Sequence, residues 1–136
     1  MSTQTVYVLF EPQCPHCGHL WQSSIPLHNK IRFVWIPIAF NSGKSLAQSA
    51  ALLSSKNPMG TMSEHETLLL SGKGGLAVSA NVPDELASTI KQNTQLFNSL
   101  GLDSVPYILA KNKISGQVIT HSGAFTTPAL SQFLGI

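Results

Sequence analysis

Two cysteines, Cys14 and Cys17, are the only cysteines of the 136-residue sequence, and they lie in the stretch FEPQCPHCGHLW. A pair separated by two residues serves as a metal clip, a structural disulfide or a reactive dithiol. A structural disulfide is the least expected of the three, because a bridge this short closes too small a loop to stabilise the fold much through chain entropy. The choice therefore lies between metal binding and sulfur chemistry.

The residues around the pair favour sulfur chemistry. Pro15 suits the first position of a helix, because an N–H group at that position has no partner within the helix. Cys14 then lies at the helix N-terminus, where unpaired backbone N–H groups and the helix dipole stabilise its thiolate, the nucleophilic form. His16 adds charge or a hydrogen bond near the same sulfur. Cys17 lies one turn further along, close enough to form a disulfide with Cys14, and we expect it to be more buried.

Metal binding needs ligands that the sequence does not supply at the usual spacing. A structural zinc site normally adds a second C-x-x-C pair or two closely spaced histidines. His19 is too close to Cys17 to complete such a site, and three further histidines are isolated in the sequence: His28, His65 and His121. Haem attachment requires a histidine directly after the second cysteine, where this sequence has Gly18. We therefore expect no metal and no organic cofactor, and a zinc-binding module remains the alternative.

The elements that position the cysteines follow from hydrophobic patterning. Residues 5–10 are a β-rich apolar run ahead of Pro12 and predict a buried strand that leads directly to the dithiol. The nearly continuous apolar run at residues 31–38 predicts a second strand, buried on both faces. A hairpin is predicted from residues 105–110 and 117–120. Helices are predicted after Pro15, at 42–56 with Ser42 as its cap, at 61–70, at 83–101 and from Thr127 onward.

This order of elements predicts an α/β fold in a single domain over residues 1–136, with a helical insertion at about 42–101 between the second strand and the hairpin. Net charge is +2, and the eight Lys and Arg residues are scattered singly, so we expect no nucleic-acid partner. The sequence has no run of about 18 apolar residues, and its first residues do not form a signal peptide. We therefore expect no insertion into a membrane.

A strand before C-x-x-C, a helix after it and a later Val105–Pro106 pair that opens a hairpin resemble the thioredoxin superfamily. The resemblance implies a thioredoxin-like fold with a central mixed sheet flanked by helices, and a cis-proline at Pro106 facing the dithiol. It also implies that Val105, Pro106 and Tyr107 contact an extended client peptide, much as an added β-strand does. For Tyr107, packing on the sheet is an equally good interpretation.

A closer resemblance is to the catalytic domain of the DsbC/DsbG-type periplasmic thiol:disulfide interchange proteins. It rests on FEPQCPHCGHLWQ, ALLSSKNP, NTQLFNSLG and the Val105–Pro106 pair. The C-P-H-C motif and the valine before proline look more like the oxidase DsbA, since the isomerases typically have threonine at that position. The isomerases also carry an N-terminal dimerisation domain, and the residues before Thr5 are too few to form one. We therefore expect either a catalytic domain cut from a longer protein or a protein that works as a monomer.

The resemblance implies a periplasmic thiol:disulfide oxidoreductase that acts on cysteine pairs of exported proteins. Its partners would be cysteine-containing protein substrates and a membrane redox partner that resets the dithiol. Two alternatives remain open. One is an isomerase or reductase domain kept reduced by a membrane partner, and the other is a non-catalytic module that binds zinc or peptides.

Four further residues lie near the dithiol in the sequence. Glu11 could relay protons to the inner thiol, but a solvated loop carboxylate is the simpler expectation. His19 is expected to be an exposed helix residue. Phe10 and Trp21 are aromatic neighbours of the site, and we expect them in the core.

Overall fold

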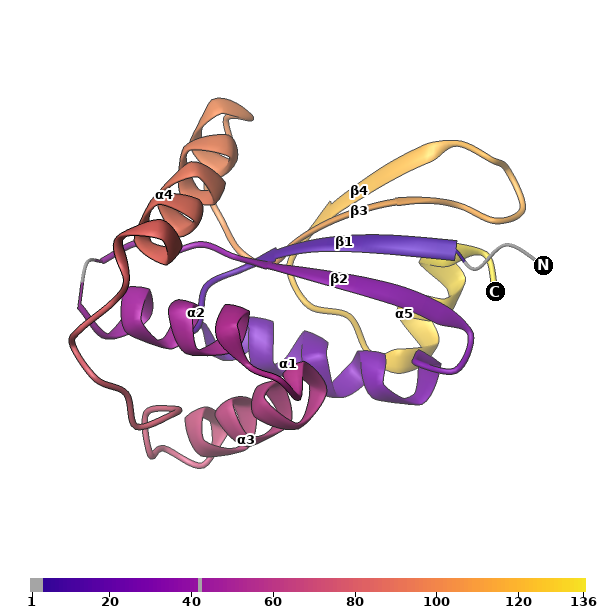
Figure 1. The fold of residues 1–136 in the computed structure, drawn as a ribbon. Coiled ribbons are helices and arrows are strands. Elements are labelled where there is room, and N and C mark those ends of the chain that lie inside the picture. The colour runs from indigo at the N-terminus through magenta and orange to yellow at the C-terminus, as the bar shows by residue number, and fades with distance from the viewer. Residues whose placement is uncertain (1–3, 42) are drawn as a thin grey trace.

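The computed structural model describes residues 4–41 and 43–136, and within them a mixed sheet of four strands forms the centre of the fold (Figure 1). The strands are β1 (Gln4–Phe10), β2 (Ile31–Pro37), β3 (Tyr107–Lys111) and β4 (Val118–Ser122). Their order is β2-β1-β3-β4, with β1 parallel to β2 and antiparallel to β3, and with β3 and β4 paired as a hairpin. The predicted α/β fold with a central mixed sheet is confirmed.

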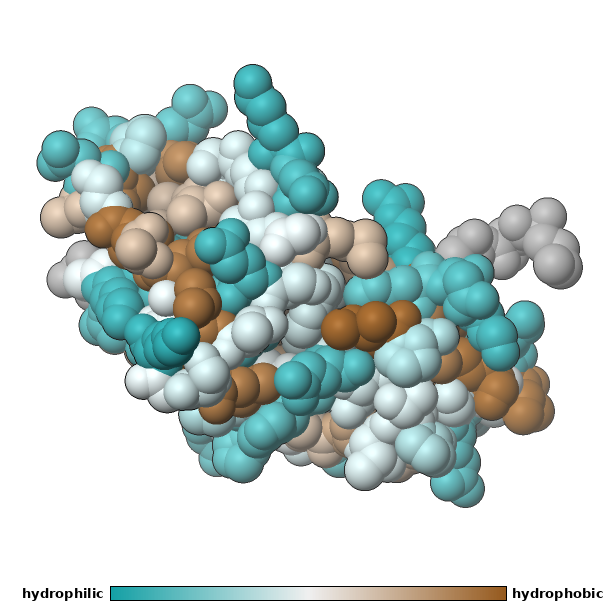
Figure 2. Space-filling view, turned by 90° about the horizontal axis from the view of Figure 1, so that it is seen from below, coloured by the Kyte–Doolittle hydropathy of each residue, from teal (hydrophilic) through white to brown (hydrophobic). Residues whose placement is uncertain are grey.

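Five helices flank the sheet: α1 (Pro15–Ser24), α2 (Lys44–Ser54), α3 (Pro58–Leu70), α4 (Asp84–Ser99) and α5 (Thr127–Leu134). Helix α1, continued by the short 3₁₀ helix η1 (Ile25–Leu27), makes the crossover that two parallel strands require. In Figure 1, α1, α3 and α5 lie on one side of the sheet and α4 lies on the other. Figure 2 views the helical side from below, where hydrophilic and weakly polar side chains separate several hydrophobic patches.

The alternation of β1 shows how the two faces differ. Val6, Val8 and Phe10 point to the side of α1 and belong to the main hydrophobic core. On the opposite face, Leu9 is buried in a smaller cluster that includes Phe97 of α4, whereas Tyr7 is 44% exposed. Helix α4 therefore covers the end of the sheet that leads to the dithiol and leaves the other end of that face open.

Three expectations about the elements need correction or remain outside the structure. Strand β2 is not buried on both faces: it lies at the edge of the sheet, and only its end residues Ile31 and Pro37 are buried. Its apolar residues are instead half-buried, because an edge strand has a neighbour on one side alone. Helix α3 begins at Pro58, three residues before the expected start at residue 61. The Asn57 side chain caps it by accepting a hydrogen bond from the backbone N–H of Gly60. Ser42, the expected cap of α2, lies outside the described residues.

Candidate active site

Cys14 is the N-cap residue of α1, as its position before Pro15 predicted. Strand β1 ends at Phe10, and a turn closed by the Cys14 N–H and the Glu11 carbonyl, 3.0 Å apart, brings the cysteine to the helix. The Cys14 Sγ accepts a hydrogen bond from the backbone N–H of Cys17 at 3.3 Å, in the way that a serine or aspartate side chain caps a helix. The Cys14 sulfur therefore acts as the N-cap of α1.

This environment favours the Cys14 thiolate. A hydrogen bond from the Cys17 side chain lowers the pKa of Cys14 most, and partial burial opposes it. The backbone N–H groups of Cys17 and His16 and the charge of His16 lower it further, so that the pKa falls from 9.0 to about 6. A half-buried thiolate at neutral pH is a reactive nucleophile.

Cys17 has the opposite properties. Its side chain is fully buried, and burial raises the pKa of the Cys17 thiol far above its usual value. The hydrogen bond to Cys14 and the nearby charges of Cys14 and Glu66 act in the same direction. The pair is therefore asymmetric, with an outer sulfur that ionises easily and an inner sulfur that keeps its proton.

The Val105–Pro106 segment meets the dithiol from the start of β3. The peptide bond between these residues is cis, as the family resemblance implied, and Pro106 is buried. The Cys14 Sγ lies 3.8 Å from the carbonyl oxygen of Val105. The carbonyl of Pro106 accepts a hydrogen bond from Gly123 N–H at 2.8 Å, which ties the segment to the end of the hairpin. Tyr107 is half-buried and packs beside the cluster under α4.

The remaining predicted residues of the helix start lie at the surface or in the core. Pro15 and His16 are exposed between the two cysteines, and His19 is exposed one turn further on, as expected. The His16 and His19 rings are 6.3 Å apart. Phe10 and Trp21 are buried, which agrees with their expected place in the core.

Glu11 is not the solvated loop carboxylate that the sequence led us to expect. Its side chain is only 4% exposed, and both of its carboxylate oxygens accept hydrogen bonds. Oε1 accepts from Gln13 N–H at 2.7 Å and from the Ser45 hydroxyl at 2.9 Å, and Oε2 accepts from Phe40 N–H at 2.8 Å. Glu11 therefore joins the loop before the dithiol to the segment after β2 and to the first turn of α2. Its burial depends on donors that lie 29 and 34 residues away in the chain.

Helix α3 contributes two buried polar residues that the sequence did not single out, His65 and Glu66. His65 is fully buried, its Nε2 lies 2.7 Å from the carbonyl oxygen of Pro12, and its Nδ1 accepts from Leu76 N–H at 3.1 Å. Since Nδ1 accepts and Nε2 faces a carbonyl, the ring carries its proton on Nε2 and is neutral. Burial lowers the pKa of His65, which agrees with the neutral ring.

Glu66 is 1% exposed, and neither of its carboxylate oxygens has a hydrogen-bond partner. It lies against Gly18, where a methyl group on the α-carbon would overlap its Oε2. The sequence itself points only to Glu11, shortly before Cys14, as a carboxylic acid near the C-x-x-C pair. No pattern in the weakly amphipathic α3 segment marks this residue.

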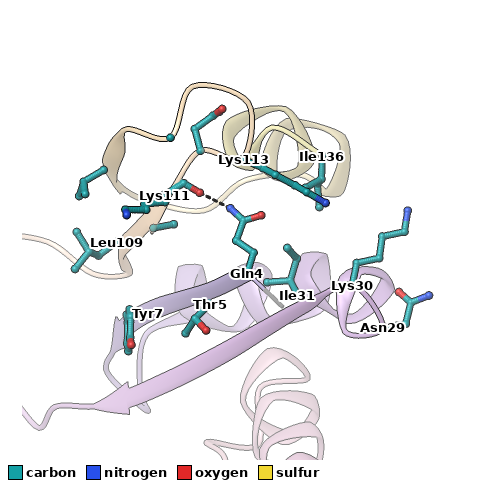
Figure 3. Close-up of a pocket in the computed structure, with 14 residues that line it drawn as sticks. Gln4, Thr5, Tyr7, Asn29, Lys30, Ile31, Leu109, Lys111, Lys113 and Ile136 are labelled. Carbon is teal, nitrogen blue, oxygen red and sulfur yellow. Dashed lines mark hydrogen bonds between the residues drawn. The ribbon is translucent and has the colours of Figure 1, made fainter. Parts of the chain in front are cut away.

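Among residues 4–41 and 43–136, no three His, Cys, Asp or Glu side chains gather closely enough to hold a metal ion. None of the helices in this part of the chain has the length and apolar character needed to cross a membrane. A concavity of about 990 Å³ lies at the start of β1 and the end of β3, where Gln4 donates a hydrogen bond to the Lys111 carbonyl (Figure 3). It includes neither cysteine and lies at the opposite end of β1 from them.

Comparisons with known proteins place the chain beside proteins of disulfide chemistry, although no family model matches its sequence. It is 30% identical over 137 residues to the thiol:disulfide interchange protein DsbG of Pseudomonas aeruginosa, covering 98% of this chain and 52% of that protein. It is 33% identical over 110 residues to DsbG of Escherichia coli, covering 79% of this chain and 44% of that protein. The chain thus spans about half the length of these curated relatives.

Solved structures agree on the fold. The crystal structure of Pseudomonas aeruginosa DsbA2 superposes with a TM-score of 0.71 at 13% identity, covering 98% of this chain and 87% of that one. The catalytic domain of Proteus mirabilis ScsC superposes with a TM-score of 0.70 at 17% identity, covering 98% and 82%. At these identities the likeness shows the fold alone.

Proposed function

Because this chain is a Dsb-type protein of the thioredoxin superfamily, we propose that it is a thiol:disulfide oxidoreductase in which Cys14 and Cys17 exchange a disulfide with cysteine pairs of exported proteins. The observation that carries the proposal is the asymmetry of the two sulfurs. Cys14 is half-buried with a pKa near 6, and Cys17 is fully buried with a raised pKa. An enzyme of this kind needs one sulfur that meets the client and another that resolves the intermediate.

The chemistry proceeds in two exchanges. In the reductive direction the Cys14 thiolate attacks one sulfur of a client disulfide, the second client sulfur leaves as a thiolate, and a mixed disulfide forms. Cys17 then loses its proton and attacks the Cys14 sulfur, which breaks the bond to the client and closes the Cys14–Cys17 disulfide. The client gains two electrons and this chain loses them. In the oxidative direction the same steps run in reverse, from a client thiolate that attacks Cys14.

The segment beside the dithiol offers a place for the client backbone. The Val105 carbonyl lies 3.8 Å from the Cys14 sulfur, before the buried cis-proline Pro106. An extended client next to Val105 would bring its cysteine to the attacking sulfur, in the manner of an added strand. We propose Val105, Pro106 and the half-buried Tyr107 as the residues of this contact.

Two single variants test the assigned roles. We expect Cys14→Ser to abolish reduction of insulin disulfides, because the attacking sulfur is gone. Cys17→Ser is expected to trap clients on Cys14 as mixed disulfides, visible as bands on non-reducing gels that disappear with dithiothreitol. The exposed His19→Ala serves as a matched control on the same helix and should behave like the wild-type protein. Equal loss of activity in both cysteine variants, with no trapped species, would contradict the assigned roles.

The preferred direction is oxidation of clients, with a membrane protein that reoxidises the dithiol in the periplasm. The support is the thiolate-stabilising surroundings of Cys14, because a stabilised thiolate makes the disulfide form more oxidising. The reduction potential of the Cys14–Cys17 pair, measured in glutathione buffers, tests this. A value of about −120 mV supports an oxidase, and a value at or below about −200 mV supports the reductase or isomerase alternative.

A further inference from the structure

Resolution of a client by Cys17 requires a group that takes the proton of a deeply buried thiol. The Cys17 side chain is fully buried, so bulk water does not reach its sulfur directly. The same proton must return when the disulfide of this chain is reduced. A titratable group buried beside the dithiol, with free hydrogen-bonding capacity, would meet both needs.

Two of the buried titratable groups near the site already have partners. Both oxygens of Glu11 accept hydrogen bonds, from Gln13, Ser45 and Phe40. Both nitrogens of His65 are also engaged, one facing the Pro12 carbonyl and the other accepting from Leu76 N–H. These contacts hold the loops around the dithiol together and engage the atoms of both groups that would take or give a proton.

Glu66 differs from both. It is 1% exposed, and neither Oε1 nor Oε2 has a hydrogen-bond partner. The His65 Nε2 is 3.7 Å from Oε1, but this nitrogen faces the Pro12 carbonyl at 2.7 Å and belongs to a neutral ring. Oε2 fills the space that a side chain at Gly18, the residue directly after Cys17, would occupy. The carboxyl group therefore packs against the first turn of α1 at Gly18, and its charge acts on the neighbouring Cys17.

We propose that Glu66 exchanges the proton of Cys17 during disulfide transfer, and that Gly18 provides the space in which its carboxyl group reaches the dithiol. The inference rests on the proposed function and adds a residue to it. In the reductive direction the Cys17 S–H bond breaks and its proton passes to the Glu66 carboxylate. The Cys17 thiolate then forms a bond to the Cys14 sulfur and the client leaves as a thiolate. In the oxidative direction protonated Glu66 returns the proton to the departing Cys17 thiolate.

The charge of Cys14 changes during the reaction in a way that favours proton transfer from Cys17 to Glu66 when Cys14 is bound to a client. Burial raises the pKa of Glu66 most, and the Cys14 thiolate raises it further, to about 8. When Cys14 is bound to a client it carries no charge, so this second contribution disappears, the pKa of Glu66 falls, and more of its carboxyl group is ionised and able to accept a proton. That is the state in which Cys17 must lose its proton. The titratable groups nearby are Cys14 and Cys17 at α1, His65 on α3, and Glu11 and Lys44, which act on His65.

The test follows the reactions of the two sulfurs as two successive kinetic phases. Reduced protein is mixed with excess 5,5′-dithiobis(2-nitrobenzoate) in a stopped-flow instrument, and release of the coloured thiolate is followed from pH 5 to pH 9. The first equivalent reports the attack of Cys14 on the reagent. The second equivalent reports displacement of the bound reagent by Cys17, which is the step assigned to Glu66.

For Glu66→Gln we expect the first phase to stay within about twofold of wild type and the second phase to slow by about tenfold or more at pH 7. The wild-type second phase should rise with pH and level off as Glu66 ionises. In Glu66→Gln it should keep rising in proportion to hydroxide. Glu64→Gln, at an exposed position on the same helix, is the matched control and should follow wild type. Gly18→Ala, which displaces the carboxyl, should also slow the second phase alone.

Each outcome bears on one proposal. If folded Glu66→Gln shows the same pH profile of the second phase as the wild-type protein, the role of Glu66 is overturned and the proposed function stays intact. Failure of wild-type protein to release either equivalent overturns the proposed function itself. If Glu66→Gln does not fold, the infrared difference spectrum between reduced and oxidised wild-type protein decides. A band of a protonated, unpaired carboxyl that changes with redox state supports the inference, and its absence at pH 7 refutes it.

Discussion

The most direct consequence of the structure is that Cys14 is largely a thiolate at neutral pH, mainly because the Cys17 side chain donates a hydrogen bond to it. With a pKa of about 6, about 90% of Cys14 is thiolate at pH 7. At the ordinary value of 9.0 the fraction would be about 1%, so the surroundings increase the nucleophilic form about ninetyfold. The hydrogen bond from the Cys17 side chain is the largest cause of this shift.

Replacement of Cys17 by alanine removes that hydrogen bond and keeps the backbone N–H that caps the sulfur. We therefore expect the pKa of Cys14 to rise from about 6 toward 9.0, with most of the ninetyfold gain in thiolate lost at pH 7. His16→Ala should raise the pKa by a smaller amount, because it keeps the backbone N–H of residue 16 and removes only the charge of His16, which is the smallest of the contributions. His19→Ala should leave it unchanged.

The assay is the pH dependence of Cys14 alkylation by iodoacetamide in reduced protein, followed by mass spectrometry, with thiolate absorbance in the ultraviolet as a second readout. Wild-type protein should label with a midpoint near pH 6, and Cys17 should remain unlabelled while the protein is folded. A wild-type midpoint near pH 9 would refute the reasoning. So would a Cys17→Ala profile that superposes on wild type, because the largest stabilising contribution would then be absent.

Three further predictions concern the buried carboxylates. The native pKa of Glu66 lies above its ordinary value of 4.5, so the wild-type free energy of unfolding should fall, relative to Glu66→Gln, by up to about 5 kcal/mol between pH 4.5 and about 8, measured by urea denaturation. Glu11→Ala leaves buried donors without partners and should cost about 2–4 kcal/mol in the same assay, whereas exposed Glu64→Ala should cost less than about 0.5 kcal/mol. Gly18→Ala places a methyl group against Glu66 and should lower the melting temperature through a loss of about 1–3 kcal/mol.

The dithiol could be predicted from the sequence because its determinants are local. Cys14, Pro15 and Cys17 lie within four residues, and the rule that proline suits the first helical position places the outer sulfur at the helix N-terminus without knowledge of the rest of the fold. The preceding apolar run likewise predicts a strand by its composition alone. The cis-proline segment lies 91 residues from Cys14, and it was found only through resemblance to a known family.

The buried polar groups could not be predicted because their environment is built from distant parts of the chain. Glu11 looks like an ordinary loop residue until Phe40 and Ser45 bring their donors to it. Glu66 lies in a segment whose apolar residues do not mark a clear inward face, so nothing in the sequence separates it from exposed Glu64. The error for β2 has the same origin, because its composition does not reveal that it has a neighbour on one side only.

The arrangement of these groups divides the control of the dithiol between two parts of the fold. The first turn of α1 supplies the sulfurs and the N–H groups that stabilise the Cys14 thiolate. The helical insertion supplies what surrounds them: Ser45 of α2 holds Glu11, and α3 places Glu66 against Gly18. Since the outer sulfur depends on local contacts and the inner sulfur on the insertion, changes in α3 should alter the resolution of clients while leaving the first attack intact. This separation is why the two phases of a single reaction, measured in one protein, can test the two parts independently.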